Sequence, residues 1–241
     1  MTKRKNIACF TAPGKELNSY LKSYKGGGRK DIHMKVFEKV QTMTKAKRVL
    51  YPGAHRHITA SLVFPHVTYL DYDKKVAQLY KDEKAREYID LNKIYDQDSE
   101  FEFHICDVLQ EHNLYNELNE KDQYDLLISL SAGVIAASCT KYIKQGGHLL
   151  VNDSHSDARS IFALNSNDWQ LVSYWKDDSF CNVDIDDCFY ILPKKKRGKV
   201  DKVKPWPISK KEVEESIRQG TVSKRSFHMI KDSNFYIFRK I

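Results

Sequence analysis

Residues that can move protons follow the stretch GGHLLVND, whose apolar run predicts a buried strand. Asp153, His155 and Asp157 lie close together just after this run. An imidazole beside a carboxylate can titrate near neutral pH and act as a general base. We therefore expect Asp153 and His155 to be the catalytic residues, with Asp157 as the other carboxylate that could poise His155. The alternative is that these polar residues only form the turn after the strand.

Three acids follow two other predicted strands. Asp71 and Asp73 end the stretch VTYLDYD, and Asp107 lies near the end of FEFHICDV. Ligands of open α/β sheets bind at the carboxyl ends of strands, and a ribose diol calls for an anionic acceptor of two hydrogen bonds. The joint placement of these acids predicts a ligand pocket. Taken singly, Asp71 could instead cap the next helix, and Asp107 could be a turn residue.

The turn PGAHRH follows the short apolar stretch RVLY. Its one glycine, Gly53, permits a sharp bend and a close approach of the backbone to a ligand. If a helix begins near Ile58, its N-terminus and the side chains of His55, Arg56 and His57 favour an anion such as a carboxylate. The alternative is that these side chains cap the turn and face water.

Strands and helices alternate through the middle of the chain. RVLY, VTYLDYD, FEFHICDV, YDLLISLSA and GGHLLVND read as buried strands, with helices over Lys74–Tyr95 and around Ile135–Ile143. DWQLVSYW and DDCFYILP follow without a clear helix between them, which predicts an antiparallel closing hairpin. The expected fold class is α/β: a mostly parallel, doubly wound sheet with helices on both faces and this hairpin at one edge.

The residues before the first strand contribute helices. We expect one helix over residues 15–24 and an amphipathic helix from Asp31 to about Lys47, where apolar residues recur at helical spacing. Three glycines, Gly26 to Gly28, separate them and predict a flexible hinge, or alternatively a flap over a substrate. A phosphate loop is not favoured, because such a loop directly follows a strand.

This order of elements resembles that of the class I S-adenosylmethionine-dependent methyltransferases. Their sheet has five parallel strands with helices between them and ends in an antiparallel hairpin. The resemblance extends from about Arg48 to Pro193 and lies in the rhythm of strand ends and acids. It implies that the cofactor is S-adenosylmethionine and that the protein transfers a methyl group to an unknown acceptor.

The resemblance also implies roles for single residues. The turn after the first strand, here Tyr51, Gly53 and Ala54, would approach the amino-acid part of the cofactor. Asp71, or Asp73 as the near alternative, would bind the ribose hydroxyls. Further implied contacts are those of Asp107 with the adenine amino group and of Ser131, with its neighbours Leu130 and Ala132, with the sulfonium.

Two subclass patterns of this family are absent. The exocyclic-amine methyltransferases of DNA carry an Asn/Asp-Pro-Pro-aromatic motif after the fourth strand, where this chain has SLSAG. Catechol-type enzymes hold a metal with an acid after strand four and an Asp-Asn pair after strand five. Here the order is Asn152-Asp153 and the strand-four acid is missing, so we expect no metal.

Composition limits the class of protein. The chain of 241 residues, 41% of them hydrophobic, can bury one sizeable core. It has no apolar run of membrane-span length, and we expect a cytoplasmic protein. Its five cysteines are scattered without a C-x-x-C pair, so neither a disulfide framework nor a zinc knuckle is predicted.

The C-terminal part carries a cluster of positive charge. Lys194, Lys195, Lys196 and Arg197 begin the run KKKRGKVDKVK, which could bind an anionic partner or form a solvated loop. A helix and a hairpin, SFHMI and NFYIFRK, are expected after it as a small extension that could extend the sheet, cover the substrate site or make a dimer contact.

The expected domains are therefore an N-terminal arm and helix (1–47), a methyltransferase-like α/β domain (48–193) and a basic linker with the C-terminal helix and hairpin (194–241).

Two functions stay open at this stage. The first is a methyltransferase. The second is a non-catalytic relative that binds nucleic acid or another anionic partner through the basic run, in which case binding would weaken steeply with added salt.

Overall fold

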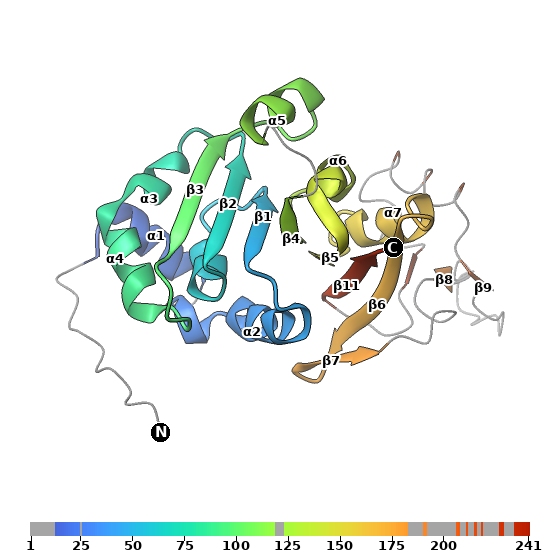
Figure 1. Cartoon of the computed structure of the whole chain (residues 1–241), viewed down its shortest axis with the longest axis horizontal. Coiled ribbons are helices and arrows are strands. Elements are labelled where there is room, and N and C mark those ends of the chain that lie inside the picture. Colours follow the sequence, from blue (N-terminus) through green and yellow to red (C-terminus); the bar gives the residue numbers. More distant parts are fainter. Residues whose placement is uncertain are drawn as a thin grey trace, which may run out of the picture.

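The structure is a computed structural model. It describes residues 13–24, 26–118, 123–182 and 234–241, the short strands at 190–191, 206–207 and 227–228, and residues 211, 215 and 218. Its centre is an eight-stranded sheet with helices packed around it (Figure 1). The α/β fold class expected from the sequence is confirmed.

Five parallel strands form the larger part of this sheet, in the order β3-β2-β1-β4-β5. Four of them, β1, β2, β4 and β5, lie on apolar runs of the sequence, because a strand covered on both faces must be apolar on both. The edge strand β3 instead alternates Glu and Phe and is partly exposed. Their bounds are β1 (Arg48–Pro52), β2 (His66–Asp71), β3 (Glu100–Ile105), β4 (Tyr124–Ser129) and β5 (Ile143–Val151).

The antiparallel end of the sheet differs from the expected hairpin. β6 (Trp169–Lys176) pairs with β7 (Ser179–Asn182) on one side and with β11 (Tyr236–Lys240) on the other. The stretch DDCFYILP contributes β8 (Tyr190–Ile191), which pairs in a separate three-stranded sheet with β9 at 206–207 and β10 at 227–228. The predicted pairing of DWQLVSYW with DDCFYILP is therefore wrong.

β11 lies between β5 and β6 because it can be buried on both faces. Ile237 packs into the core on one face of the sheet and Phe238 into the core on the other. Asp177 and Asp178, both at positive φ, form the tight turn that brings β7 back against β6. The last strand of the C-terminal extension thus extends the main sheet, which is one of the three options left open for this extension. The domain boundaries expected from the sequence stay predictions.

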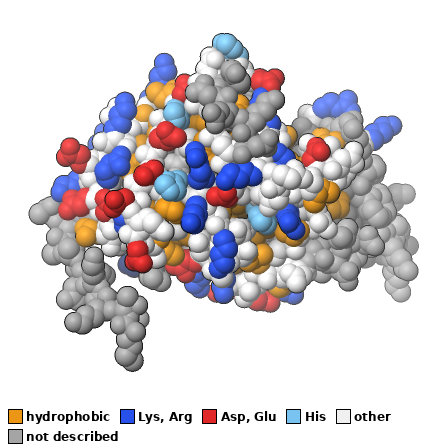
Figure 2. Space-filling view, viewed as in Figure 1, with side chains coloured by type: hydrophobic (Ala, Val, Ile, Leu, Met, Phe, Trp, Pro, Cys, Tyr) orange, Lys and Arg blue, Asp and Glu red, His pale blue; other side chains and the backbone are white. Residues whose placement is uncertain are grey.

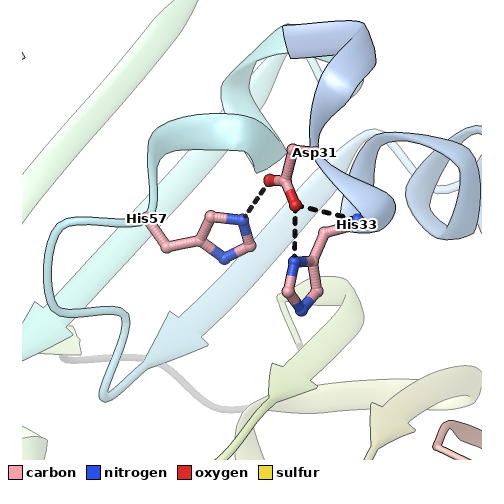
Figure 3. A group of neighbouring side chains, drawn as sticks. All are labelled: Asp31, His33 and His57. Atoms are coloured by element: carbon pink, nitrogen blue, oxygen red, sulfur yellow. Dashed lines mark hydrogen bonds and ion pairs between the residues drawn. The ribbon is translucent and has the colours of Figure 1, made fainter. Parts of the chain in front are cut away.

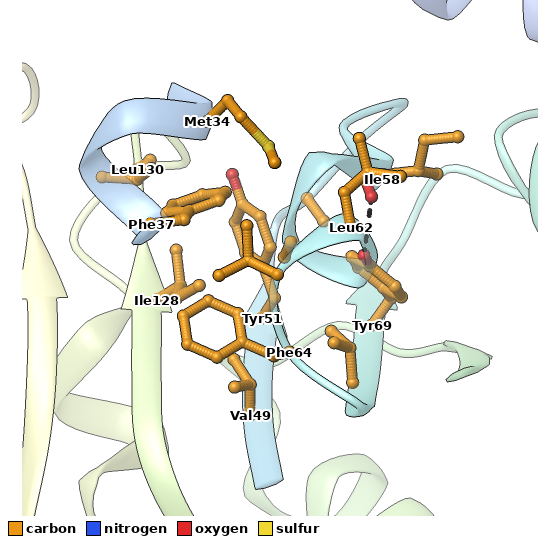
Figure 4. Packing of buried hydrophobic residues seen from close by; sticks show 14 of the residues in the cluster. Met34, Phe37, Val49, Tyr51, Ile58, Leu62, Phe64, Tyr69, Ile128 and Leu130 are labelled. Carbon is orange, nitrogen blue, oxygen red and sulfur yellow. Dashed lines mark hydrogen bonds between the residues drawn. The ribbon is translucent and has the colours of Figure 1, made fainter. Parts of the chain in front are cut away.

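One face of the sheet is covered by the N-terminal helices and the segments after β1 and β2. Apolar side chains from alternate positions of β1 and β4, among them Tyr51 and Ile128, point into this core together with Phe37 of the first long helix (Figure 4). The covering elements are α1 (Lys15–Ser23), α2 (Ile32–Thr44), α3 (Ala77–Lys81), α4 (Glu83–Asn92) and the 3₁₀ helix η2 (Ile58–Leu62).

The other face is covered by shorter helices. They are α5 (Glu111–Leu118), α6 (Ala136–Cys139), the 3₁₀ helix η3 (Thr140–Tyr142) and α7 (Asp157–Leu164), which pack on Leu50, Leu127 and Leu149. A third 3₁₀ turn, η1 (Gly28–Lys30), precedes α2.

The helix expected over Lys74–Tyr95 is in fact two. Asp82 has an extended backbone, and its side chain accepts the N–H of Lys84, so the residue ends α3 and caps α4. By contrast, α1 and α2 lie where the sequence predicts them. The α2 cap is Asp31, whose Oδ1 accepts the N–H of His33 at 3.0 Å.

Charged side chains of both signs lie side by side on the face shown in Figure 2. The net charge of +8 therefore does not produce a uniformly positive surface on this face. Among the described residues, no helix is both long enough and apolar enough to cross a membrane.

Candidate functional site

The two halves of the parallel sheet meet between β1 and β4. From β1 the chain moves outward to β2 and β3, and it then returns to β4 on the other side of β1. Ligands of open α/β sheets bind outside the carboxyl strand ends at such a reversal. Three non-glycine residues at this edge have positive φ, namely His55, Ser131 and Ser156. Such backbone costs free energy and clusters at functional sites, so this edge is the candidate site.

The turn after β1 packs against the loop after β4. Gly53 has a φ of +64° and donates its N–H to the carbonyl of Leu70 at 2.7 Å. A Cβ atom on Gly53 would lie 2.2 Å from the Cβ of Ala132. The glycine is therefore required by a contact within the protein, and its neighbours Tyr51 and Ala54 are buried.

Asp71 joins the ends of β1 and β2. Its Oδ2 accepts the backbone N–H of His55 at 2.9 Å, and its Oδ1 accepts the N–H of Asp73 at 2.9 Å. A carboxylate offers about four lone-pair sites, so each oxygen can accept one more hydrogen bond. Asp71 is thus a buried, rigidly held acceptor beside the strand reversal.

Asp73 and Asp107 shape the turns that follow β2 and β3. Asp73 accepts the N–H of Lys75 at 2.9 Å, and Asp107 accepts the N–H of Leu109 at 3.1 Å. Asp107 also accepts from the side-chain amide of Gln110 at 3.2 Å. Both acids therefore make Asx-type turns, which is the alternative considered for Asp107 from the sequence.

Two large apolar side chains lie exposed beside these acids. Tyr72, directly after Asp71, is 77% exposed, and Leu109, two residues after Asp107, is 65% exposed. β2 and β3 are neighbours in register, so both residues follow adjacent strand ends. These two side chains offer apolar surface at the carboxyl ends of the strands, where ligands of such sheets bind.

The loops after β4 and β5 are tied together by side chains. The N–H of Ser131 donates to Oδ1 of Asn152 at 3.0 Å, and Nδ2 of Asn152 donates to Oγ of Ser131 at 2.7 Å. This reciprocal pair stabilises the left-handed backbone of Ser131, which is exposed.

The expected catalytic pair is not brought together. Asp153 forms a largely buried ion pair with Arg159, whose Nε donates to Oδ2 of Asp153 at 2.7 Å. His155 is exposed and forms no hydrogen bond or ion pair within the part of the chain that the structure describes. Asp153 is therefore placed to hold the loop in shape, and among the described residues no carboxylate orients His155.

Asp157 is buried behind this loop instead of beside His155. Its Oδ2 accepts the hydroxyl of Ser129 at 2.5 Å, and both its oxygens accept the N–H of Ala136 at 3.2 and 3.3 Å. Burial raises the pKa of Asp157 to about 7, although these hydrogen bonds oppose the rise. The residue thus links the end of β4 to α6 and α7 and titrates near neutral pH.

A group of three side chains that the sequence did not single out lies at the start of α2. Oδ1 of Asp31 is 2.8 Å from Nδ1 of His33, and Oδ2 is 2.9 Å from Nε2 of His57, so that both imidazoles point at the carboxylate (Figure 3). Thr59 also donates to Oδ2 at 2.6 Å. The only sequence signal was the spacing of Asp31 and His33 at a helix start, since His57 lies far along the chain.

Further hydrogen bonds lead outward from this group. The hydroxyl of Tyr51 lies 2.8 Å from Nδ1 of His57, and the hydroxyl of Tyr20 lies 2.9 Å from that of Thr59. The N–H of Gly28 donates to the same Tyr20 hydroxyl at 3.3 Å. A Cβ on Gly27 would lie 2.7 Å from the ring of Tyr20, so the glycine segment is packed close to the core at this point.

The protonation states in the group follow from these contacts. Burial alone would raise the pKa of Asp31, but hydrogen bonds from His33, His57 and Thr59 hold it well below its usual range. Burial lowers the pKa of His57 to about 4 despite its bond to Asp31, so the ring is neutral at pH 7. An ionised carboxylate can only accept hydrogen bonds, so Nε2 of His57 carries the ring proton and donates it to Asp31. The hydroxyl of Tyr51 then donates to Nδ1.

The cationic turn after β1 meets acids of the chain itself. Nε of Arg56 lies 3.6 Å from Glu16, and His57 is bonded to Asp31. The helix that begins at Ile58 is a 3₁₀ segment. The side chains of Arg56 and His57 therefore do not simply cap the turn and face water, and the anions they meet belong to the protein.

No protein-family model matches the chain, and no curated protein matches it. Solved structures with a similar fold include a candidate caffeoyl-CoA O-methyltransferase from Staphylococcus aureus, at 12% identity and a TM-score of 0.44 over 68% of this chain and 89% of that one. Others are the O-methyltransferase TomG from Streptomyces achromogenes, involved in tomaymycin synthesis and solved in complex with SAM, and a methyltransferase from Geobacter sulfurreducens.

TomG is 12% identical with a TM-score of 0.42, over 70% of this chain and 87% of that chain. The Geobacter protein is 10% identical with a TM-score of 0.40, over 68% and 85%. The strand order and the site of the chain itself carry the proposed function. The basic residues Lys194, Lys195, Lys196 and Arg197 lie outside the described residues.

Proposed function

We propose that the protein binds S-adenosylmethionine at the carboxyl ends of β1 to β4 and transfers its methyl group to an acceptor. The observation that carries this proposal is the arrangement at the end of β2. There a fixed carboxylate, Asp71, is followed by the exposed ring of Tyr72, beside the strand reversal where ligands of such sheets bind.

The residues at this edge fit the nucleoside part of the cofactor. Each carboxylate oxygen of Asp71 already accepts one hydrogen bond from a backbone N–H group. Its remaining lone pairs can accept hydrogen bonds from the two ribose hydroxyls. Tyr72 and Leu109 offer apolar surface for the adenine ring, and Asp107 lies beside them as an acceptor for its amino group. Asp73, the alternative ribose ligand, is already used in its own turn.

The residues near the ends of β1 and β4 would face the sulfonium end. Gly53 keeps the turn after β1 close to the loop after β4, and Ser131 is held by Asn152 at the start of that loop. Tyr51 and Ala54 are buried beneath the turn and support it. When bound, S-adenosylmethionine supplies an electrophilic methyl group for in-line displacement.

The protein must orient the acceptor and, where needed, remove its proton. His155 is the candidate base, because it is exposed on the loop after β5. Asp153, which we also expected to be catalytic, would act indirectly by holding this loop through its ion pair with Arg159.

Calorimetric titration with S-adenosylmethionine and with its demethylated product tests the proposal. We expect micromolar binding to the wild type. Tyr72→Ala should weaken it about 5- to 150-fold, because stacking of a base on an aromatic ring contributes about 1–3 kcal/mol. Leu91→Ala, which truncates another exposed apolar residue, on α4, should bind like the wild type.

Asp71→Asn should also weaken binding, since it removes the anionic acceptor of the ribose. Its fold must be checked by circular dichroism, because Asp71 also holds two backbone N–H groups. Absence of binding at millimolar cofactor would refute the proposal. The alternative of a non-catalytic module acting through Lys194 to Arg197 would then be tested by salt-dependent oligonucleotide binding.

A further inference from the structure

We propose that Asp31, His33 and His57 form a binding site for one divalent transition-metal ion, with an open coordination position facing a neighbouring cavity. One ligand atom from each residue can be chosen so that all three lie within 4.8 Å of one another. The inference does not depend on the proposed methyltransferase activity, because the three residues lie outside the nucleoside pocket described above.

The donor atoms suit such an ion. Two imidazole nitrogens and a carboxylate favour Zn²⁺, Fe²⁺ or Co²⁺ over Mg²⁺ and Ca²⁺, which prefer oxygen ligands. Metal–ligand distances of about 2.0–2.2 Å require donor atoms roughly 3.3 Å apart in a tetrahedral site. Oδ1 of Asp31 lies 2.8 Å from His33 and Oδ2 lies 2.9 Å from His57, so the contact of the ligating oxygen would lengthen by about half an ångström. The other donor atoms, which lie within 4.8 Å of one another, would approach to the same spacing.

The carboxylate and one imidazole of the group are shielded from solvent. The side chains of Asp31 and His57 are each only 3% exposed. Within the described residues the ion pairs of Asp31 are with His33 and His57 alone, so a divalent cation would compensate a buried negative charge.

An outer shell of hydrogen bonds is already present. Thr59 donates to the carboxylate of Asp31, and Tyr51 bonds the far nitrogen of His57. Protein metal ligands are usually oriented by partners of this kind, which fix the ring plane and the tautomer. Tyr20 in turn bonds Thr59, so the shell is anchored in the core.

The site has one open side. The side chain of His33 is 22% exposed, and it lines a cavity of about 500 Å³ together with Asp31, Tyr24, Lys30 and Lys35. Three protein ligands with an accessible fourth position are typical of catalytic rather than structural zinc sites. Lys35 already pairs with Asp178 at 3.1 Å, so Lys30 is the lysine of the cavity wall that favours an anionic oxygen donor as the additional ligand.

The test is a titration of full-length, untagged, chelator-treated protein with Co²⁺, followed by visible absorption. We expect one Co²⁺ per chain, with the strong bands of four- or five-coordinate cobalt. His33→Gln should weaken binding at least about 10-fold. His104→Gln is the matched control, because His104 also contacts a carboxylate, Glu117 at 2.7 Å, but on the surface; this variant should bind Co²⁺ like the wild type.

Equal binding by His33→Gln and the wild type, or no binding at about 100 µM Co²⁺, would overturn the proposal. A measurement without mutation is the ¹⁵N NMR spectrum of the histidine rings. Zn²⁺ should move the proton of His57 from Nε2 to Nδ1, with Tyr51 becoming the acceptor. An unchanged tautomer at saturating Zn²⁺ would equally contradict it, whatever the cofactor titration shows.

Discussion

Asp31 and His57 lie 26 residues apart in the chain, yet Oδ2 of Asp31 is 2.9 Å from Nε2 of His57, deep inside the protein. The bond ties the start of α2 to the turn after β1. It therefore links an element that precedes the sheet to the edge where we place the cofactor. Because both side chains are buried, each depends on its hydrogen-bond partners to stay satisfied.

Tyr51→Phe removes the donor to Nδ1 of His57 and leaves this buried nitrogen without its partner. The free energy of unfolding should fall by about 1–3 kcal/mol. Urea denaturation of the two proteins measures the difference. Tyr72→Phe is the control, since its ring is mostly exposed, and it should change stability by less than about 0.5 kcal/mol. Equal stability of Tyr51→Phe and the wild type would contradict the assigned network.

Gly53→Ala introduces a Cβ at positive φ and against Ala132. Left-handed backbone costs a non-glycine residue about 1–2 kcal/mol, and overpacking adds about 1–3 kcal/mol. We expect a loss of about 2–5 kcal/mol in the free energy of unfolding. Adding Ala132→Gly should recover the overpacking part. If the double variant is no more stable than Gly53→Ala, the two loops do not touch as the structure has them.

Asp157 should make stability fall as the pH rises. Its folded-state pKa is about 7, against 3.8 for an unperturbed aspartate, so the folded state keeps a proton that the unfolded state loses. The stabilisation from this raised pKa is complete below pH 4 and is lost as the pH rises to about 7. The free energy of unfolding should fall by up to about 4 kcal/mol over this range. Asp157→Asn imitates the neutral acid and should flatten this slope. Unfolding in urea from pH 4.5 to 8 tests it; parallel curves for the two proteins would refute the raised pKa.

Asp153→Ala leaves the guanidinium of Arg159 buried without its carboxylate. Breaking a buried ion pair from one side costs about 3–5 kcal/mol, so this variant should be strongly destabilised. His155→Ala, two residues away and exposed, should keep the stability of the wild type within about 0.5 kcal/mol. Thermal unfolding measures both. Similar melting temperatures would mean that the Asp153 ion pair does not hold the loop.

Phe238→Ala tests the place of β11 in the sheet. The side chain is fully buried between β5 and β6, and such truncations cost about 3–5 kcal/mol. Arg239→Ala, at the next position and exposed, should have little effect. Chemical denaturation of both variants decides the point. A mild effect of Phe238→Ala would place the C-terminal strand outside the main sheet.

The sequence by itself determined the parallel part of the sheet and the helix before it. A strand covered on both faces must be apolar throughout, and a helix against a sheet must repeat its apolar residues every three or four positions. Both patterns are local, so β1, β2, β4, β5 and α2 were readable in advance. The edge strand β3 was readable from its alternation of Glu and Phe, which is typical of a half-exposed strand. The same reasoning placed Asp71 and Asp107 at strand ends, because strand ends are visible where the apolar run stops.

Only the tertiary structure decided which distant segments meet. The local pattern of β6 does not show that its partner is the last strand of the chain, since pairing in a sheet depends on backbone bonds that any extended segment can make. Likewise, Asp153 was found to pair with Arg159, while His57 was brought to Asp31 and His33 by the packing of α2 on β1. Side-chain clusters of this kind arise from contacts between elements, and no local repeat in the chain encodes them.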